Sequence, residues 1–471
     1  MASLRPLSSR ALSTSSSRLA HSLGGDPREI CFPIPGKTPK VTTADKAFEG
    51  IKSGESIFVH GAAATPTPLL NALCEHVSGN NLSKIRLHHM HLEGEARWLD
   101  QKYRDQIRSN SLFTGHNLRK GMDEGLVDFN SCFLCEIPLL FRRKAITVNT
   151  AIIQVSPPDQ NGYCSLGTSV DTARAALTHS KRIIAMTNKN MPRTFGDSVI
   201  HQSQIDVIVE CDDHKLPERK IDPLGDQEKK IGQIIAEKLV DNGATLQMGI
   251  GAIPDAALAA LGGHKDLGIH TEMFSDGVLP LIQKNVITNR FKTAFPGKLV
   301  VSFVHGTNKL YDFLNDNPLV HFGDCQWVND PSYIRKMHKM TAINSAVEID
   351  LTGQIVSASV GTRFLSGFGG QVDFLRGAAI SDDGLGKPII AITSATKKGE
   401  SKIVPFIKQG AGVVTTRAHA HYIVTEYGIA RLWGKNMRQR AYELIQISHP
   451  DQRANLEKSA FERLKVMPSR D

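Results

Sequence analysis

Apolar and polar positions follow a rhythm of short buried strands and amphipathic helices along this chain. Continuous runs rich in Val and Ile predict strands that are buried on both faces, as in parallel sheets. Apolar residues spaced three to four apart after Asp226 predict a helix that begins there. The predicted strands span residues 144–155, 182–186, 205–209, 298–303, 388–392 and 411–415, and the apolar positions of the helix are Ile231, Ile234, Ile235 and Leu239. Residues 436–463 predict helices with a break at Pro450.

Two segments share one spacing of glycine, proline and leucine. The matching pairs are Gly61 with Gly249, Pro66 with Pro254 and Leu73 with Leu261. Each segment predicts a helix that ends at a glycine in the left-handed conformation, then a short apolar strand, then a helix opened by the proline. The repeat favours two α/β halves of similar design, although two unrelated strand–turn–helix units could match in the same way.

A polar, proline-bearing stretch over residues 212–226 has the composition of a linker between these halves. We therefore expect two similar open α/β domains with mostly parallel sheets, over residues 26–222 and 223–471. The length of 471 residues suits two such domains.

The first 25 residues are serine-rich, carry Arg5, Arg10 and Arg18, and contain no acidic residue. This composition predicts a mitochondrial transit peptide over residues 1–25 and a location in the mitochondrial matrix. The seven dispersed cysteines fit a reducing compartment. The net charge of +9 is a modest surplus that suits an anionic ligand and is too diffuse to indicate nucleic acid. No apolar run reaches the ~20 residues of a membrane span.

Two patterns resemble metal sites without completing one. Cys132 and Cys135 form a CxxC pair in a segment that predicts a strand, but no second pair accompanies it. His89 and His91 would share one face of a strand, yet no further ligand lies nearby in the sequence. We therefore predict no metal.

Candidate chemistry centres on Glu272, in the turn-rich stretch from Gly268 to Gly277. A carboxylate held at the end of a strand can act as a nucleophile. The glycine-rich turn over residues 249–254 could offer backbone N–H groups to an anion, or could serve packing alone. In residues 367–377, glycines are followed by three polar residues, Gln371, Asp373 and Arg376. Such bare backbone permits close approach to a ligand.

Several motifs in order resemble the acetyl-CoA hydrolase/transferase family, a branch of the coenzyme A transferases, over residues 35–465. In the first half these are VSPPDQNG at 155–162, SLG at 165–167 and NMPRT at 190–194. In the second half they are HTEMFSDG at 270–277, GFGGQVDFLRGA at 367–378, TEYGIA at 425–430 and GKNMR at 434–438. The resemblance implies the CoA-transferase fold for both domains.

The resemblance also implies a ping-pong exchange in which Glu272 attacks an acyl-CoA and forms a glutamyl-CoA thioester. Backbone amides at Ile250 and Gly370, beside Gly251 and Gly369, would form the oxyanion hole and the CoA-binding turns. Asn329 would contact the reacting carboxylate. Lys397, Lys398 and Lys435 are candidate contacts of the CoA phosphates. The expected partners are acetyl-CoA or succinyl-CoA and acetate, succinate or 4-hydroxybutyrate, with CoA as a substrate, no permanently bound cofactor, and a homodimer or homotetramer.

Two alternatives remain open at this point. An acetyl-CoA hydrolase would use the same intermediates with water as the acceptor, and a non-catalytic CoA- or nucleotide-binding protein would keep the glycine turns without needing Glu272. Among the other acids, we expect Glu426 to be structural. Asp276 and Asp373 are expected to position the loops around Glu272.

Overall fold

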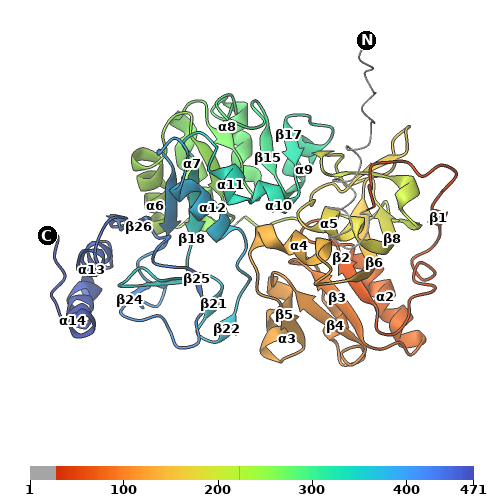
Figure 1. The fold of residues 1–471 in the computed structure, drawn as a ribbon, viewed down its shortest axis with the longest axis horizontal. Helices are drawn as coiled ribbons and strands as arrows, with labels where there is room; N and C mark the ends of the chain where they lie inside the picture. Colours follow the sequence, from red (N-terminus) through yellow and green to blue (C-terminus); the bar gives the residue numbers. More distant parts are fainter. Residues whose placement is uncertain (1–27, 222) are drawn as a thin grey trace, which may run out of the picture.

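Two α/β lobes lie side by side in the computed structural model, which describes residues 28–221 and 223–471 (Figure 1). The predicted transit peptide, residues 1–25, lies outside the described residues. Residues 211–221 and 223–225, which form neither helix nor strand, lie between the lobes where the linker is predicted. The proposed boundary between residues 222 and 223 falls within this segment.

The first lobe is built on an eight-stranded sheet in which all neighbouring strands are parallel. Its strands, in spatial order, are β1 Lys40–Val41, β11 Val207–Glu210, β8 Ser180–Thr187, β6 Val148–Val155, β2 Ser56–Val59, β3 Ile85–His89, β4 Ile107–Ser111 and β5 Val127–Phe129. The helices of this lobe are α2 Thr67–Gly79, α3 Arg119–Asp123, α4 Ile137–Arg142 and α5 Ala173–Thr178.

The second lobe is built on a six-stranded sheet that is parallel except for its last pair. Its strands, in spatial order, are β13 Gly268–Ile269, β12 Thr245–Met248, β18 Thr341–Ser345, β23 Lys387–Ala391, β26 Tyr422–Thr425 and β27 Gly428–Arg431. Its helices are α6 Asp226–Lys238, α7 Ala252–Ala260, α8 Leu279–Gln283, α9 Asn308–Leu314, α10 Cys325–Val328, α11 Pro331–Ile334, α12 Gln371–Ala379, α13 Met437–Gln446 and α14 Arg453–Leu464.

Five smaller sheets complete the fold. Three of them are pairs: β7 Tyr163–Ser165 with β10 Val199–His201, β14 Met273–Phe274 with β16 Phe303–Val304, and β21 Ser359–Val360 with β22 Arg363–Phe364. The fourth sheet has three strands, β15 Leu299–Val301, β17 Val320–Phe322 and β9 Phe195–Gly196. The fifth has four strands, β24 Ile403–Val404, β19 Glu348–Asp350, β20 Ile355–Val356 and β25 Val413–Thr415. The pairing of β9 with β17 links the lobes, because β9 precedes the connecting segment and β17 follows it.

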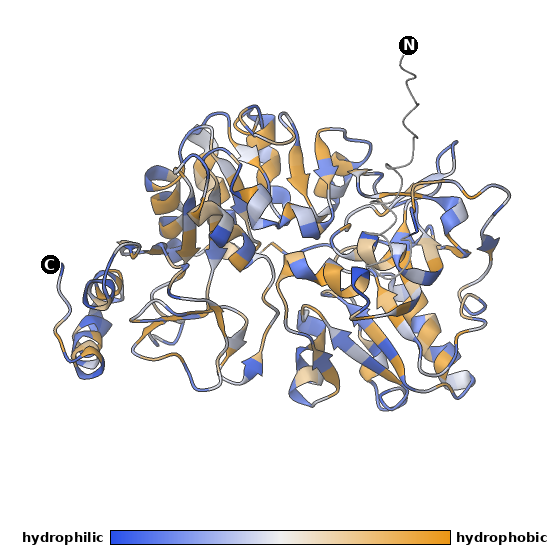
Figure 2. Ribbon diagram, in the orientation of Figure 1, coloured by the Kyte–Doolittle hydropathy of each residue, from blue (hydrophilic) through white to orange (hydrophobic). Residues whose placement is uncertain are grey.

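The hydrophobic core follows the Val- and Ile-rich strands, and apolar segments of the ribbon occur on strands and helices of both lobes (Figure 2). One continuous cluster of buried side chains includes Phe58 and Phe141 of the first lobe and Leu246 and Phe322 of the second. Strands covered on both faces bury most of their side chains, which explains why their sequences are continuous apolar runs. The predicted α/β class with mostly parallel sheets is therefore confirmed.

The predicted repeat is present in its strand and second helix, whereas its first helix forms only in the second segment, as α6, which ends at Lys238 and not at Gly243. α2 follows β2 along the chain as α7 follows β12 in the second lobe. Residues 47–54, predicted as a helix, are turns instead, and Gly54 has a φ of +84° without capping a helix. The prediction that Pro254 opens its helix is also wrong, because α7 begins two residues earlier at Ala252. The apolar spacing before Gly54 covers too few residues to sustain a helix.

The CxxC segment is another correction. Cys132 lies in a loop and Cys135 lies in a single 3-10 turn, Leu134–Glu136, rather than in a strand. Pro138 at the start of α4 favours this helical turn, since proline fits the first turn of a helix.

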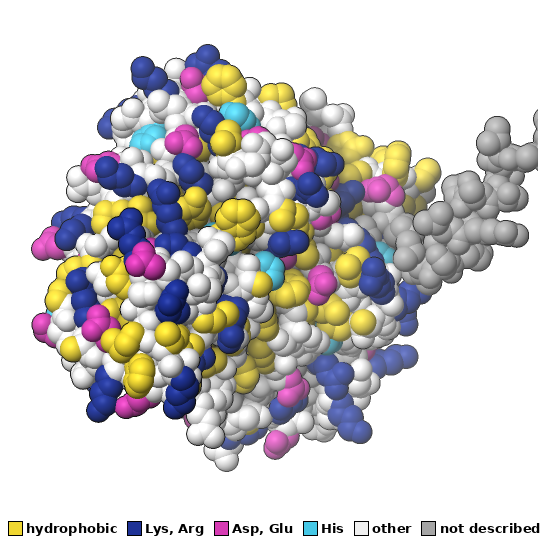
Figure 3. All heavy atoms as spheres, turned by 60° about the vertical axis from the view of Figure 1, so that its left-hand side comes forward, with side chains coloured by type: hydrophobic (Ala, Val, Ile, Leu, Met, Phe, Trp, Pro, Cys, Tyr) yellow, Lys and Arg dark blue, Asp and Glu magenta, His cyan; other side chains and the backbone are white. Residues whose placement is uncertain are grey.

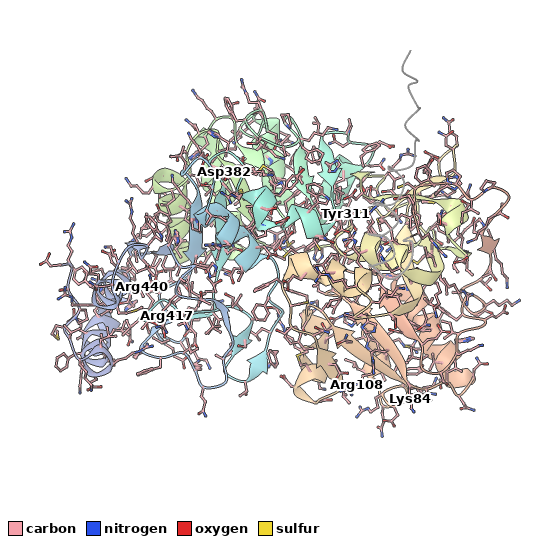
Figure 4. All side chains as sticks on the ribbon, in the orientation of Figure 1. Lys84, Arg108, Tyr311, Asp382, Arg417 and Arg440 are labelled. Atoms are coloured by element: carbon pink, nitrogen blue, oxygen red, sulfur yellow. The ribbon has the colours of Figure 1, made fainter. Side chains whose placement is uncertain are left out.

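The C-terminal helices form with the predicted break, as α13 and α14 separated by a turn at Pro450. Arg440 of α13 fixes them to the second lobe by donating to the carbonyl oxygens of Thr352, Leu432 and Arg417. Arg440 and Arg417 lie close together at this end of the molecule (Figure 4).

Candidate functional site

Glu272 lies between β13 and β14, at the carboxyl end of the second sheet. Its backbone oxygen accepts hydrogen bonds from the amides of Ser302 and Phe303 at 2.9 and 3.0 Å. The preceding residue, Thr271, donates from its hydroxyl to the carbonyl of Met248 at the end of β12. These bonds fix the backbone on both sides of the carboxylate. Ligand sites of open parallel sheets commonly lie at this edge.

Two donors meet at the Glu272 carboxylate. The side-chain amide of Asn329, the residue that follows α10, donates to Glu272 Oε2 at 3.1 Å. The backbone N–H of Gly370, immediately before α12, donates to the same carboxylate. A Cβ at position 370 would overlap both Glu272 Oε2 and Asn329 Nδ2, so this approach requires glycine. The contact that the resemblance implies for Asn329 is present in the structure.

Burial sets the proton affinity of this carboxyl group. It raises the pKa of Glu272 to about 7, while the hydrogen bonds from Asn329 and Gly370 oppose the rise. Desolvation disfavours the charged form and donors favour it. A sizeable fraction of Glu272 is therefore ionised near neutral pH, and a desolvated carboxylate is a better nucleophile than one surrounded by water.

Glu272 opens into a cavity of about 590 Å³ whose wall comes from both lobes and from the connecting segment. The first lobe contributes Met90, His91, Glu93, Phe113, Thr114, Gly115, His116, Arg119 and Leu134; the connecting segment contributes Glu218, Arg219 and Lys220; the second lobe contributes Gly249, Ile250, Glu272, Met273, Phe303, His305 and Gly369. Tyr311 ties the connecting segment to the second lobe by donating from its hydroxyl to the carbonyl of Pro217 (Figure 4).

Both predicted glycine turns reach this cavity. Ile250 lines it and is 39% exposed, and Gly251 has a φ of +125°, which L side chains rarely adopt. Gly369 also lines it and has a φ of +60°. The structure thus brings Glu272, Asn329 and the two turns together. Their roles in catalysis stay predictions.

The three predicted lysine contacts are not among the residues that line the cavity. Lys435 pairs with Glu443, and Lys397 and Lys398 are exposed in a turn. The cations that line the cavity are Arg119, Arg219 and Lys220. Arg219 also pairs with Asp255 in the first turn of α7 at 2.6 Å. Lysine-rich turns are common on surfaces, so composition alone could not distinguish these two sets of cations.

The other acids of the motifs, Glu426, Asp276 and Asp373, accept hydrogen bonds from residues distant in the sequence. Glu426 accepts from the amide of Ser394 at 3.0 Å and from its hydroxyl at 2.6 Å, outside the cavity. Asp276 accepts from the amide of Thr307 at 3.0 Å and so joins the loops after β14 and β16. Asp373, in the first turn of α12, lies 3.5 Å from Asn329 Nδ2.

Two histidines of the cavity wall were not predicted as site residues. His91 Nδ1 and His305 Nε2 are buried without a hydrogen-bond partner in the structure. Burial lowers the pKa of His305 to about 4 and also lowers that of His91, so both rings are neutral at pH 7. In the sequence, His91 belongs to a run that resembles a metal ligand set, and no pattern marks His305.

Three general features bear on metal binding, membrane insertion and surface charge. Within residues 28–221 and 223–471 there is no group of three or more His, Cys, Asp or Glu side chains arranged to hold a metal ion. None of the helices in that part of the chain combines the length and apolar character of a membrane span. On the face drawn in Figure 3, Lys and Arg side chains are spread among acidic and apolar ones.

Comparison with known proteins adds the family context. Models described as the N-terminal and C-terminal domains of acetyl-CoA hydrolase/transferase match residues 37–217 and 306–460. A succinyl-CoA:acetate/propanoyl-CoA:succinate CoA transferase of Fasciola hepatica is 55% identical over 94% of this chain and 92% of its own. A 4-hydroxybutyrate coenzyme A transferase of Clostridium kluyveri is 47% identical over 88% and 96%.

The comparison extends to solved structures and to hydrolases. The crystal structure of a 4-hydroxybutyrate CoA-transferase from Porphyromonas gingivalis is 39% identical and superposes with a TM-score of 0.76, over 90% of this chain and 98% of that one. Yeast proteins named acetyl-CoA hydrolase match at 26–28% identity.

Proposed function

Since the chain belongs to the acetyl-CoA hydrolase/transferase family and is a CoA-transferase, we propose that Glu272 carries CoA between two carboxylic acids. The observation behind this proposal is the Glu272 carboxylate itself, held by the Asn329 amide and the Gly370 N–H at the wall of the cavity. The two donors fix the orientation of the carboxylate at the cavity wall, and the group can still ionise near neutral pH, as a nucleophile must.

The exchange proceeds through two covalent intermediates. The Glu272 carboxylate attacks the acyl-CoA carbonyl, the C–S bond breaks, and an acyl-glutamyl anhydride and CoA thiolate result. The thiolate then attacks the glutamyl carbonyl, the C–O bond breaks, and the first acid leaves as its carboxylate. The resulting glutamyl-CoA thioester reacts with the second carboxylate by the same two steps in reverse. Charge and protons balance at each step, so no permanently bound cofactor is needed.

The glycine turns supply the oxyanion hole in this proposal. Negative charge develops on the carbonyl oxygens under attack, and fixed N–H donors stabilise it without reorganisation. The amides of Ile250 and Gly370 act as the donors, and Gly251 and Gly369 give the turns the conformations that expose them. Loss of one such donor typically slows the reaction by about 10²–10³.

The substrates are acetyl-CoA or succinyl-CoA with acetate, succinate or 4-hydroxybutyrate. The relatives named for succinyl-CoA, acetate and 4-hydroxybutyrate support this class. Two of these acids carry a polar group at the end away from the reacting carboxylate. His91 Nδ1 and His305 Nε2 are buried, unpartnered nitrogens at the cavity wall and can bond to such a group.

Replacement of His305 tests this substrate class. His305→Phe should raise the KM of succinate and 4-hydroxybutyrate several-fold and leave the KM of acetate nearly unchanged, because acetate has no second polar group. His179→Phe, which changes a histidine outside the cavity wall, is the control. Equal effects on all three acids would count against the assignment.

An acetyl-CoA hydrolase is the second candidate, because water could collect the acyl group from the same intermediate. The relatives named as hydrolases are more distant than those named as transferases, which favours the transferase. Initial rates with and without added carboxylate separate the two activities. Full turnover of acyl-CoA without an acceptor acid would contradict the transferase proposal.

Mass spectrometry of the intermediate tests the role of Glu272 directly. After mixing with acyl-CoA and no acceptor, we expect a CoA-sized adduct on the peptide that contains Glu272. Glu272→Ala should abolish the adduct and the activity, whereas Glu457→Ala, at an exposed position of α14, should keep both. Activity that survives in Glu272→Ala, or an adduct on another residue, would remove the mechanism.

We also propose that residues 1–25 direct the chain to the mitochondrial matrix and that the enzyme is a homodimer or homotetramer. The serine- and arginine-rich composition of this segment supports the first part. Fusion of residues 1–25 to a fluorescent protein tests import, and light scattering on the purified chain measures the assembly. Diffuse fluorescence or a monomeric mass would contradict the respective part.

A further inference from the structure

One side-chain amide joins Glu272 to a second carboxyl group. Asn329 Nδ2 lies 3.1 Å from Glu272 Oε2 and 3.5 Å from Asp373 Oδ2. An amide NH₂ group has two hydrogens, so each carboxyl group can accept one. Asn329 is 0% exposed, and its Oδ1 has no partner in the structure. The two carboxyl groups are thus the hydrogen-bond partners that orient this amide.

The opposite lobe fixes Asp373 in turn. The backbone N–H of Cys135 donates to Asp373 Oδ2 and its thiol donates to Oδ1, both at 3.2 Å. The neighbouring Leu134 donates from its amide to the carbonyl of Gly369 at 3.1 Å. With Asn329, three donors converge on Asp373, and such a set favours the ionised carboxylate.

Burial limits the charge that the two carboxyl groups can hold together. Desolvation raises the pKa of Asp373 to about 7, as it does for Glu272, and repulsion by Glu272 contributes to the rise. Two carboxyl groups in one buried site titrate as a pair, and ionisation of one opposes ionisation of the other. In the resting enzyme the pair therefore carries one negative charge. This charge accepts the hydrogen bonds of the donors, and the second carboxyl group stays neutral, which avoids the desolvation cost of a second buried charge.

The surrounding titratable groups leave this balance in place. The thiols that interact with Asp373 have pKa values raised by burial and stay neutral; they belong to Cys132, Cys135 and Cys325. On the cavity side of Glu272 stand the neutral His91 and His305, and the wall also carries Glu93, His116, Arg119, Glu218, Arg219 and Lys220.

We propose that Asp373 is a positioning residue that holds the Asn329 amide against Glu272 and shares a single negative charge with it. The proposal rests on Glu272 being the nucleophile. When Glu272 becomes a neutral anhydride or thioester, Asp373 ionises and releases its proton to solvent, so the charge moves across Asn329. The Asn329 NH₂ then keeps an acceptor on each side throughout the cycle, since an acylated Glu272 still presents a carbonyl oxygen.

The pH dependence of adduct formation tests this proposal. In Asp373→Asn the amide oxygen can still accept from Asn329, but the competing charge is gone. We expect the acid limb of the rate of glutamyl-CoA formation to become steeper and its midpoint to move by about one pH unit toward lower pH, because Glu272 of the wild type becomes fully ionised only when the coupled pair takes on its second charge. A role confined to structure would lower the rate at every pH and leave the limb in place, and that result would overturn the proposal.

Variants of Cys135 provide a test that keeps Asp373. Cys135→Ala removes one donor to Asp373, favours its neutral form, and should move the acid limb in the same direction by a smaller amount. Cys135→Ser restores a donor and should return the limb to its original position. Asp382→Asn, which changes an exposed acid that pairs with Arg335 and does not bond to Asn329, should leave it there. A shift in Asp382→Asn, or none in Cys135→Ala, would contradict the proposal.

Failure of this inference is distinguishable from failure of the proposed function. If Glu272→Ala retains activity, the nucleophile itself is misassigned. If Glu272→Ala is inactive and forms no adduct while Asp373→Asn keeps the original pH profile, only the shared charge is wrong.

Discussion

At the scale of single residues, the site depends on a glycine at the point where Glu272 and Asn329 meet. Gly370 has an ordinary φ of −96°, so its backbone conformation alone does not require glycine. The requirement is spatial, because any Cβ would overlap the side chains of Glu272 and Asn329. One missing methyl group therefore allows a backbone donor to reach the carboxylate.

Replacement of Gly370 by alanine should disable catalysis more than folding. We expect Gly370→Ala to lower kcat by about 10² or more, since the carboxylate and its donors are pushed apart. Gly262→Ala is the matched control, because a Cβ there meets nothing within 4 Å. Steady-state kinetics and thermal unfolding of both variants measure the effect. An unchanged kcat in Gly370→Ala would show that the donor is dispensable.

Glu272 should also reduce stability as the pH rises. Its pKa is about 7 in the folded protein against an ordinary value of 4.5, so the folded state holds a proton that the unfolded chain releases between these values. The stability from this group is therefore present below pH 4.5 and is lost as the pH rises through 7. Glu272→Gln should be more stable than the wild type by about 3 kcal/mol at pH 8 and little different at pH 4.5. Urea unfolding at both pH values measures this, and an equal difference at both would contradict it.

At the scale of elements, the short helix α10 ends immediately before Asn329 and is held by the opposite lobe. Asp324 caps its N-terminus by accepting from the amide of Gln326 and pairs with Arg142 of α4 at 2.5 Å. Asp197, which follows β9, accepts from the indole of Trp327 at 2.8 Å. The two lobes thus set the position of Asn329 together.

Loss of Arg142 should destabilise the protein and slow the reaction. Asp324 is 3% exposed, so Arg142→Met would leave a buried charge without its partner. We expect a loss of about 3 kcal/mol in the free energy of unfolding and a lower kcat. Adding Asp324→Asn should recover part of the loss, because asparagine still caps the helix without a charge. A double-mutant cycle measures the coupling, and purely additive losses would argue against the pair.

At the scale of the whole molecule, the first residues that the structure describes, from Arg28 onward, are already packed against the first lobe. Arg28 donates from its amide to the carbonyl of Thr178, and Ile30 is 0% exposed in the core. Both sheets and every proposed site residue lie further along the chain.

Two truncations follow from this arrangement. Removal of residues 1–25 should leave kcat and the unfolding temperature unchanged. Removal of residues 1–36 should lower the unfolding temperature, because it deletes Ile30 and the contacts of Arg28. Kinetics and calorimetry on both forms check this. A loss of activity in the shorter deletion would show that the segment contributes to more than import.

The sequence predicted elements best where the pattern was long. The strand runs at 144–155 and 182–186 became β6 and β8, and the helix predicted from Asp226 begins there. The prediction from sequence failed at residues 47–54 and at the CxxC segment. In both places the pattern covers only a few residues, and packing decides between turn, strand and helix. For the site, the motif around Glu272 and the glycine clusters were visible, whereas His305 and the cations of the cavity were not.

The sequence by itself determined the α/β class, the order of the motifs and the choice of Glu272, because these depend on local periodicity and on residues close together in the chain. Only the tertiary structure decided what surrounds Glu272. Asn329, Asp373 and Cys135 are 57, 101 and 137 residues away from it in sequence, and they meet because two sheets and a linking strand pair fix both lobes in space. The physical reason is that desolvation and hydrogen bonding act over a few ångströms, a proximity that spacing along the chain does not encode.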